Sequence, residues 1–163
     1  MEKEPIKVGM ADYKVALNPS SLITTGLGSC VGICLWDPQK RIGGLAHIML
    51  PDSTQSRMLQ NRSKYADTGI PLLIEDMIKL GANRARLVAK IAGGAQMFAF
   101  PGNTSNLMRI GERNTEAVKK CLEEFKIRLV GEDTGGSCGR TIEFFTVNGM
   151  LLIKTINKGE KII

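Results

Sequence analysis

Aromatic residues are scarce in this sequence of 163 residues, which contains one Trp, two Tyr and five Phe. Surfaces that bind nucleic acids commonly combine basic residues with aromatic side chains on which bases stack. The chain is basic, with a net charge of +6 and a pI near 9.3. However, its charges are spread along the sequence, and no zinc-finger, helix-turn-helix or RNA-recognition signature is present. Charge alone supplies only a non-specific attraction to an acidic partner, so we do not expect binding to nucleic acid.

Long hydrophobic runs are also absent. No segment approaches the ~18 consecutive apolar residues that a membrane-spanning helix needs, and residues 1–7 are largely charged. We therefore expect a cytoplasmic protein without a membrane-inserted segment. In that compartment the four cysteines should remain thiols. The 43% hydrophobic and 23% charged residues are typical of a globular protein. We expect residues 1–163 to form a single domain.

Residues 24–50 contain two apolar segments, residues 30–36 and 42–50, that are rich in β-branched and large side chains. Residues 37–40, Asp-Pro-Gln-Lys, separate them. Asp suits the first position of a type I turn because its side chain accepts hydrogen bonds from the backbone beyond it, and Pro suits the second because its φ is fixed. The pattern predicts a β-hairpin with a four-residue loop.

The predicted pairing places Cys30 opposite His47, the only histidine. If residues 37–40 form the loop, Trp36 pairs with Arg41, and the same register pairs Cys30 with His47. Directly opposed side chains share one face of a sheet, with Cβ atoms roughly 4.5–5.5 Å apart. A shift of one residue would put the thiol and the imidazole on opposite faces, so the register is a testable prediction.

A cysteine beside a histidine indicates nucleophilic chemistry. The thiolate is the nucleophile, and a neighbouring imidazolium lowers the pKa of a thiol from about 8.5 towards neutrality. The same histidine can protonate a leaving amine. The glycines before Cys30 permit a close approach of the backbone. Amide groups at Gly28 and Ser29 are therefore candidates to stabilise a developing oxyanion.

Three other interpretations use the same residues. Cys30 and His47 could simply pack in the core, as free Cys and lone His commonly do. A metal site could be formed by Cys30, Cys34, His47 and Cys138, although the spacing lacks a second matched pair of ligands. A cysteine peptidase would use the same dyad on a backbone amide.

The rest of the chain predicts an α+β fold, with mostly antiparallel β-sheet layers packed with two main helices. Strands are predicted at residues 6–10, 13–17, 86–91, 127–131, 141–147 and 150–156. One helix is predicted to start at Asp67 or Thr68, because Pro71 is tolerated only in a first turn, and to end at Gly81. The other begins near Asn114. Surface loops are expected at residues 52–64 and 98–113, and a loose tail after residue 157.

Several segments resemble the CheD family of chemoreceptor glutamine deamidases. They are Gly-Leu-Gly-Ser-Cys-Val at 26–31, Gly-Gly-Leu-Ala-His-Ile-Met-Leu-Pro at 43–51, Lys-Tyr-Ala-Asp at 64–67, Ala-Lys-Ile-Ala-Gly-Gly-Ala at 89–95, Met-Phe at 97–98, Ile-Gly-Glu-Arg-Asn at 110–114, Glu-Asp-Thr-Gly-Gly at 132–136 and Gly-Arg at 139–140. The resemblance covers nearly the whole chain, and the order and spacing of the segments make it specific.

The resemblance implies hydrolysis of glutamine side chains in methyl-accepting chemotaxis receptors to glutamate and ammonia, through a thioester and without a cofactor. It assigns Cys30 as nucleophile, His47 as base and acid, and Thr24 as the residue that orients His47, with Thr25 as the alternative. It also implies a fold related to the deamidating domain of cytotoxic necrotizing factor toxins.

We expect the chain to be a monomer on its own. By the same resemblance it would bind the phosphatase CheC. Met97, Phe98 and Phe100 are the candidate contacts. The competing functional hypothesis is a non-catalytic adaptor that binds CheC and receptors.

Overall fold

The computed structural model describes residues 4–54, 61–97 and 109–163. Two five-stranded sheets and two α-helices make up this part of the chain, which confirms the predicted α+β class. In chain order the elements are β1 (Ile6–Lys7), β2 (Asp12–Leu17), β3 (Ser21–Leu27), β4 (Val31–Asp37), β5 (Ile42–Ile48), α1 (Ala66–Leu80), β6 (Val88–Gly93), α2 (Ile110–Glu124), β7 (Arg128–Thr134), β8 (Arg140–Phe145), β9 (Leu151–Thr155) and β10 (Gly159–Ile162).

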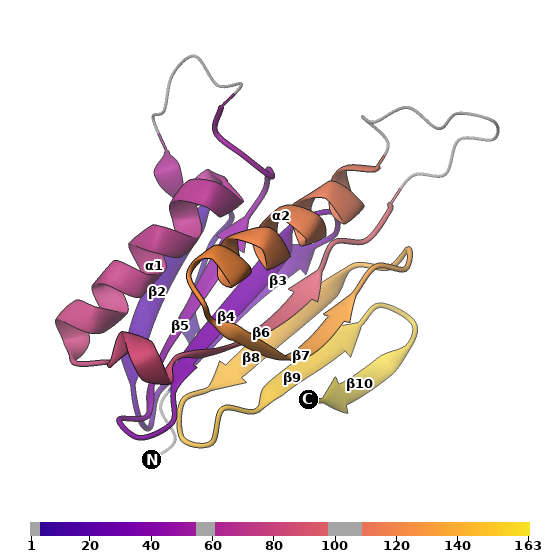
Figure 1. The fold of residues 1–163 in the computed structure, drawn as a ribbon. Helices are drawn as coiled ribbons and strands as arrows, with labels where there is room; N and C mark the ends of the chain where they lie inside the picture. The colour runs from indigo at the N-terminus through magenta and orange to yellow at the C-terminus, as the bar shows by residue number, and fades with distance from the viewer. Residues whose placement is uncertain (1–3, 55–60, 98–108) are drawn as a thin grey trace.

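The molecule has three layers (Figure 1). Both helices cover one face of the sheet with strand order β2-β5-β4-β6-β7, and the second sheet, β1-β3-β8-β9-β10, lies behind it. Most strand pairs are antiparallel; β1–β3 and β6–β7 are parallel. One apolar core fills the space between the helices and the first sheet, and a second fills the space between the sheets. Alternate residues of β4 therefore face different cores.

The β4–β5 hairpin forms, but its register differs by two residues from the predicted one. Trp36 pairs with Gly43 rather than Arg41, and Gly32 rather than Cys30 pairs with His47. The loop is again four residues long but runs from 38 to 41, because Arg41 has a positive φ of 53° and its N–H bonds to the Asp37 carbonyl at 2.8 Å. Since side chains alternate with a period of two, a two-residue shift leaves Cys30 and His47 on the same face.

Other boundaries also differ from the predictions. Helix α1 begins at Ala66, which makes Pro71 its sixth residue, and α2 begins at Ile110, four residues before the predicted start. Strand β3 was not predicted, because its Thr-Thr-Gly segment lacks an apolar pattern. The expectation of a loose tail after residue 157 is wrong, since β10 pairs with β9. Residues 55–60 of the predicted loop at 52–64, and most of the loop at 98–113, lie outside the described residues.

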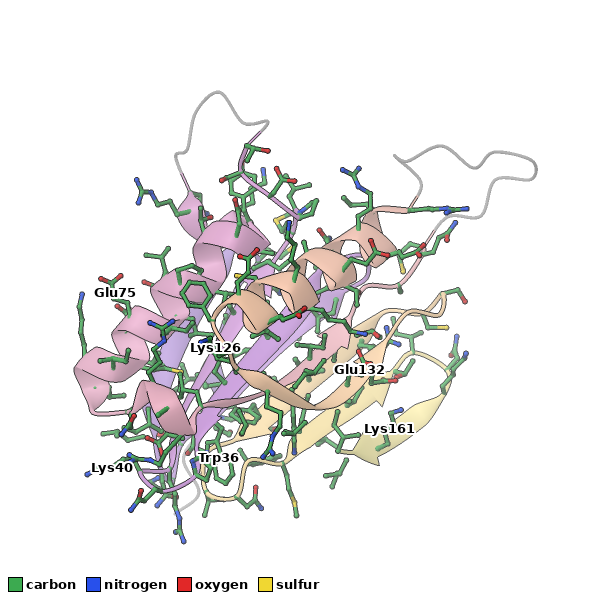
Figure 2. The ribbon with its side chains drawn as sticks, viewed as in Figure 1. Trp36, Lys40, Glu75, Lys126, Glu132 and Lys161 are labelled. Atoms are coloured by element: carbon green, nitrogen blue, oxygen red, sulfur yellow. The ribbon has the colours of Figure 1, made fainter. Side chains whose placement is uncertain are left out.

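The end of the hairpin is fixed by Asp37. Its buried carboxylate accepts two hydrogen bonds from the Arg86 guanidinium, at 3.0 and 2.9 Å, and one from the Asn83 amide at 2.8 Å. It also accepts the amides of Gln39 and Lys40, as the turn prediction anticipated. Figure 2 shows Lys40 and Trp36 at this end of the molecule. Cys30 directly precedes β4, so it lies at the opposite end of the strand.

Replacing Asp37 with Asn is expected to lower the free energy of unfolding at pH 7 by about 2 kcal/mol, because the buried carboxylate loses its charge and its ion pair with the partly exposed Arg86. Burial favours the neutral acid, but Arg86 and the three amides hold the pKa of Asp37 at about 2, below its ordinary 3.8. The stabilisation is therefore complete above pH 3.8 and is lost as the pH falls towards 2. Urea unfolding at several pH values tests both effects. Glu160→Gln, at the exposed ion pair with Lys154, is the control; an equal effect there would contradict the assignment.

Among the described residues, no helix is both long and apolar enough to span a membrane.

Candidate active site

His47 is held from the opposite sheet by a single hydrogen bond. It lies on β5, is fully buried, and its Nδ1 is 2.7 Å from the Oγ1 of Thr24 on β3. The Thr24 hydroxyl is also 2.7 Å from the carbonyl oxygen of Val8. The contact therefore crosses the space between the two sheets and joins three segments of the chain.

These two distances determine where the proton of a neutral His47 lies. A carbonyl oxygen only accepts, so the single hydroxyl proton of Thr24 is donated to Val8. The Thr24 oxygen then accepts from Nδ1–H of His47, and both contacts become hydrogen bonds. In this tautomer Nε2 of His47 carries a lone pair. That nitrogen is buried and has no partner among the described residues, so it is free to take a proton.

Cys30 lies on the same side of the first sheet as His47. Gly32, directly opposite His47, is two residues after Cys30, so the thiol and the imidazole are diagonal rather than direct neighbours. Cys30 belongs to the core between the sheets, the cluster that also contains Leu27 and Ala92. The structure thus brings Cys30, His47 and Thr24 to one inter-sheet region.

Thr24 and not Thr25 contacts the histidine. Thr24 is 2% exposed, whereas Thr25 is exposed on the outer face of β3. Alternation along the strand explains the difference, because adjacent residues point to opposite faces. Of the two threonines that the sequence left open, the geometry selects Thr24.

The backbone around Cys30 is held by the end of β6. Gly94 donates its N–H to the Cys30 carbonyl at 2.8 Å, and Ala95 donates to the Gly28 carbonyl at 2.8 Å. Gly93 has a φ of +112°, and a Cβ built there would lie 2.3 Å from the Cys30 carbonyl oxygen. Only glycine permits that approach. The sequence around Gly93 does not by itself identify Cys30 as the residue that it approaches.

The two candidate oxyanion donors differ in availability. The Gly28 amide donates to the Gly26 carbonyl at 3.1 Å. The Ser29 amide has no backbone partner within the part of the chain that the structure describes. Ser29 directly precedes Cys30, so its amide is the better placed of the two to donate to a substrate.

The site favours neutral groups. Burial raises the pKa of the Cys30 thiol, an effect that its own backbone amide partly offsets. Burial also lowers the pKa of His47 from 6.5 to about 4. The expected lowering of the thiol pKa by an imidazolium therefore does not arise, because a buried imidazole is neutral at pH 7. The resting pair is a thiol and a neutral base.

His47 should titrate near pH 4 rather than 6.5. Because it is the only histidine, its Hε1 resonance in a proton NMR titration is unambiguous. A folded-state pKa below the unfolded one means that the stability linked to His47 is complete above pH 6.5 and decreases as the pH falls towards 4. A midpoint near 6.5 in the folded protein would show that His47 is solvated and would contradict the buried, neutral base.

Met97 is the one candidate partner contact that the structure describes. It is 44% exposed, and a Cβ built on Gly28 would lie 3.0 Å from its Cγ. Met97 therefore packs against the turn that carries Cys30. Phe98 and Phe100 lie outside the described residues.

The four residues of the metal hypothesis do not come together as ligands. Within residues 4–54, 61–97 and 109–163, no three His, Cys, Asp or Glu side chains form a group that could hold a metal ion.

Sequence reasoning missed two contributors to the site. The Val8 carbonyl could not be found, because a backbone acceptor leaves no residue-type signal. Asn114, on α2, was interpreted as a helix start and as part of a segment that resembles the CheD family, but not as a contact of the site; its side chain donates to the Ser29 carbonyl. The sequence does not show that Asn114 is buried, so it offered no signal for this contact.

Comparisons with known proteins identify the family of this chain. The family model described as "CheD chemotactic sensory transduction" matches residues 49–155. The probable chemoreceptor glutamine deamidase CheD of Syntrophomonas wolfei subsp. wolfei is 56% identical over 158 residues, covering 97% of this chain and 98% of the relative. That of Caldanaerobacter subterraneus subsp. tengcongensis is 55% identical over 163 residues, covering all of both chains. The chemoreceptor glutamine deamidase CheD of Halalkalibacterium halodurans is 53% identical over 157 residues, or 96% of each chain.

The family model begins after His47, but the relatives extend over Thr24, Cys30 and His47 as well. More than half of the chain matches the family model, and relatives above 50% identity span it almost end to end. The chain therefore belongs to the CheD family.

Proposed function

We propose that this protein hydrolyses the side-chain amides of selected glutamines in chemotaxis receptors, with Cys30 as nucleophile and His47 as base and acid. The observation that carries the proposal is the Thr24–His47 hydrogen bond. It leaves the buried Nε2, which has no partner in the described part of the chain, on the sheet face that also carries Cys30. The names of the relatives supply the substrate class.

In the first step the Cys30 sulfur attacks the carbon of the glutamine amide. Because both groups are neutral at rest, Nε2 of His47 takes the thiol proton as the sulfur–carbon bond forms, and the carbonyl electrons move onto oxygen. Thr24 stabilises the imidazolium by accepting the hydrogen bond from Nδ1–H. The Ser29 amide is the proposed donor to the oxyanion.

In the second step the tetrahedral intermediate collapses. The carbon–nitrogen bond breaks, and Nε2–H of His47 protonates the departing nitrogen, which leaves as ammonia. A thioester on Cys30 remains. His47 then takes a proton from water, the oxygen attacks the thioester, and the carbon–sulfur bond breaks to give glutamate and the Cys30 thiol. The net reaction consumes one water for each amide.

The test is incubation with the cytoplasmic fragment of a chemoreceptor, read by peptide mass spectrometry. Wild type should convert particular glutamines to glutamate, Cys30→Ala and His47→Ala should not, and Cys138→Ala should behave as wild type. Cys138 is a half-buried thiol in the loop between β7 and β8, so it controls for cysteine loss as such. Peptide-bond cleavage would instead indicate a peptidase.

The CheC partnership is also a proposal, and Met97 is its one described contact. Since Met97 packs on Gly28, a partner bound there would lie beside Cys30. If the protein is an adaptor only, Cys30→Ala retains CheC binding and wild type converts no receptor glutamine.

A further inference from the structure

Asn114 has a buried side-chain amide whose nitrogen and oxygen differ in hydrogen bonding. It is the fifth residue of α2 and is 0% exposed. Its Nδ2 donates two hydrogen bonds, whereas its Oδ1 has no partner among the residues that the structure describes. Among the described residues, only Asn114 Oδ1 and His47 Nε2 are buried side-chain N or O atoms without a hydrogen bond. Burying an unpaired amide oxygen is unfavourable. The hydrogen bonds that Nδ2 donates must therefore be the reason that an asparagine occupies this buried position.

The donor end connects the two chain segments that carry the proposed nucleophile and base. Nδ2 donates to the Ser29 carbonyl at 2.9 Å and to the Met49 carbonyl at 3.0 Å. Ser29 directly precedes Cys30, and Met49 lies two residues after His47. One side-chain nitrogen thus links both segments.

The two hydrogen bonds of Asn114 lie beyond the end of the β4–β5 ladder, where the strands are no longer paired. The last residue pair between β4 and β5 at this end is Val31 with Ile48. Cys30 and Met49 lie just beyond it, outside both strands. The Asn114 amide therefore continues the connection between the two strands past the final ladder pair.

Helix α2 is itself fixed against the same region. A Cβ built on Gly111 would lie 2.4 Å from the Ala95 carbonyl oxygen, so only glycine lets the helix approach the end of β6 this closely. Gly94 and Ala95 are the residues whose amides hold the carbonyls of Cys30 and Gly28. The helix that carries Asn114 is consequently seated on the backbone that supports the Cys30 turn.

We infer that Asn114 is a positioning residue that sets the placement of Cys30 relative to His47, an inference that rests on the proposed function. The role requires two N–H donors on one atom between two carbonyl acceptors. A carboxylate offers none, and a neutral carboxylic acid offers one. Asn114→Asp is therefore nearly isosteric, but its ionised form, which is favoured as the pH rises to 8, cannot make the link.

In the deamidation assay, Asn114→Asp is expected to lower kcat by about 10²-fold at pH 8 with little change in KM, because misplacing a reacting group by about 1 Å has that cost. Burial and the two carbonyl dipoles raise the pKa of the introduced carboxyl. Its neutral form donates one hydrogen bond, so activity should rise as the pH is lowered from 8 towards 5.5. Wild type should show no such rise, because His47 remains the neutral base down to about pH 4.

Val118→Ala is the matched control. Val118 lies one turn further along α2, is equally buried and contacts the core between the helices and the first sheet. It should lower the melting temperature while leaving kcat and its pH profile unchanged. If Asn114→Asp behaves like Val118→Ala, Asn114 is only a core residue and the inference is wrong.

A second readout does not depend on the receptor substrate. Iodoacetamide labelling followed by peptide mass spectrometry compares Cys30 with Cys138 in the same sample. In Asn114→Asp and Asn114→Ala, Cys30 labelling relative to Cys138 should increase because the Cys30 turn opens locally; in Val118→Ala the ratio should not change. An unchanged ratio in the Asn114 variants would overturn the inference. If wild type converts no glutamine, the proposed function fails, but this labelling still decides whether Asn114 holds the Cys30 turn.

Discussion

Replacing Cys30 with Ser is expected to abolish glutamine conversion, with a loss of about 10⁵–10⁶-fold in kcat, the scale on which removing a nucleophile inactivates a covalent hydrolase. Serine keeps the shape of the side chain, so the fold should be retained. Its hydroxyl, however, is a far weaker acid than a thiol. Neutral His47 therefore takes the proton of a hydroxyl far less readily than that of a thiol, since proton transfer depends on how the acidity of the donor matches the basicity of the acceptor.

The measurement is the initial rate of glutamate formation on a receptor fragment, with the melting temperature of each variant. Cys138→Ser is the control and should retain the wild-type rate. A Cys30→Ser protein that is folded and retains even a hundredth of the activity would be inconsistent with a cysteine nucleophile.

Replacing Thr24 with Val is expected to lower kcat by about 10²–10³-fold, within the range contributed by general acid–base catalysis. Valine has the same shape but no hydroxyl, so Nδ1 of His47 loses its only acceptor. The neutral ring is then free to carry its proton on Nε2, which would occupy the atom that must accept the thiol proton. The ¹⁵N chemical shifts of the single histidine report this tautomer directly.

Two variants separate this effect from packing. Thr24→Ser keeps the hydroxyl and should retain most of the activity and the wild-type tautomer. Thr25→Val changes an exposed residue on the other face of β3 and should alter neither. Equal losses in Thr24→Val and Thr25→Val would show that the Thr24–His47 bond does not orient the imidazole.

The placement of Cys30 and His47 on one face of the sheet could be predicted from local sequence, because it depends on a single hairpin. Asp37 and Pro38 mark the turn, and the apolar segments on each side mark the strands. The register was wrong by two residues, because Asp37 bonds to Arg86, 49 residues away, and so belongs to β4 rather than to the loop. No local pattern encodes that ion pair. The shared face was nevertheless correct, because an even shift preserves the alternation of side chains.

Contacts between distant segments could not be predicted in the same way. The choice of Thr24 over Thr25 depends on which face of β3 meets the first sheet, and β3 had no apolar alternation to indicate this. The Val8 carbonyl comes from the segment between β1 and β2, and the Asn114 amide comes from α2. Both residues lie outside residues 24–50. Side-chain hydrogen bonds to backbone carbonyls leave no spacing rule, so only the folded arrangement identifies them.

The central claim is that a receptor glutamine becomes covalently attached to Cys30. The most direct measurement is to mix the protein with a receptor fragment, quench in acid within the first turnover, and determine intact and peptide masses. The account predicts an adduct with the mass of the fragment less ammonia, located on the peptide that contains Cys30, removed by hydroxylamine and absent from Cys30→Ala. Conversion of glutamine to glutamate by Cys30→Ala at the wild-type rate, without an adduct at any time, would contradict it.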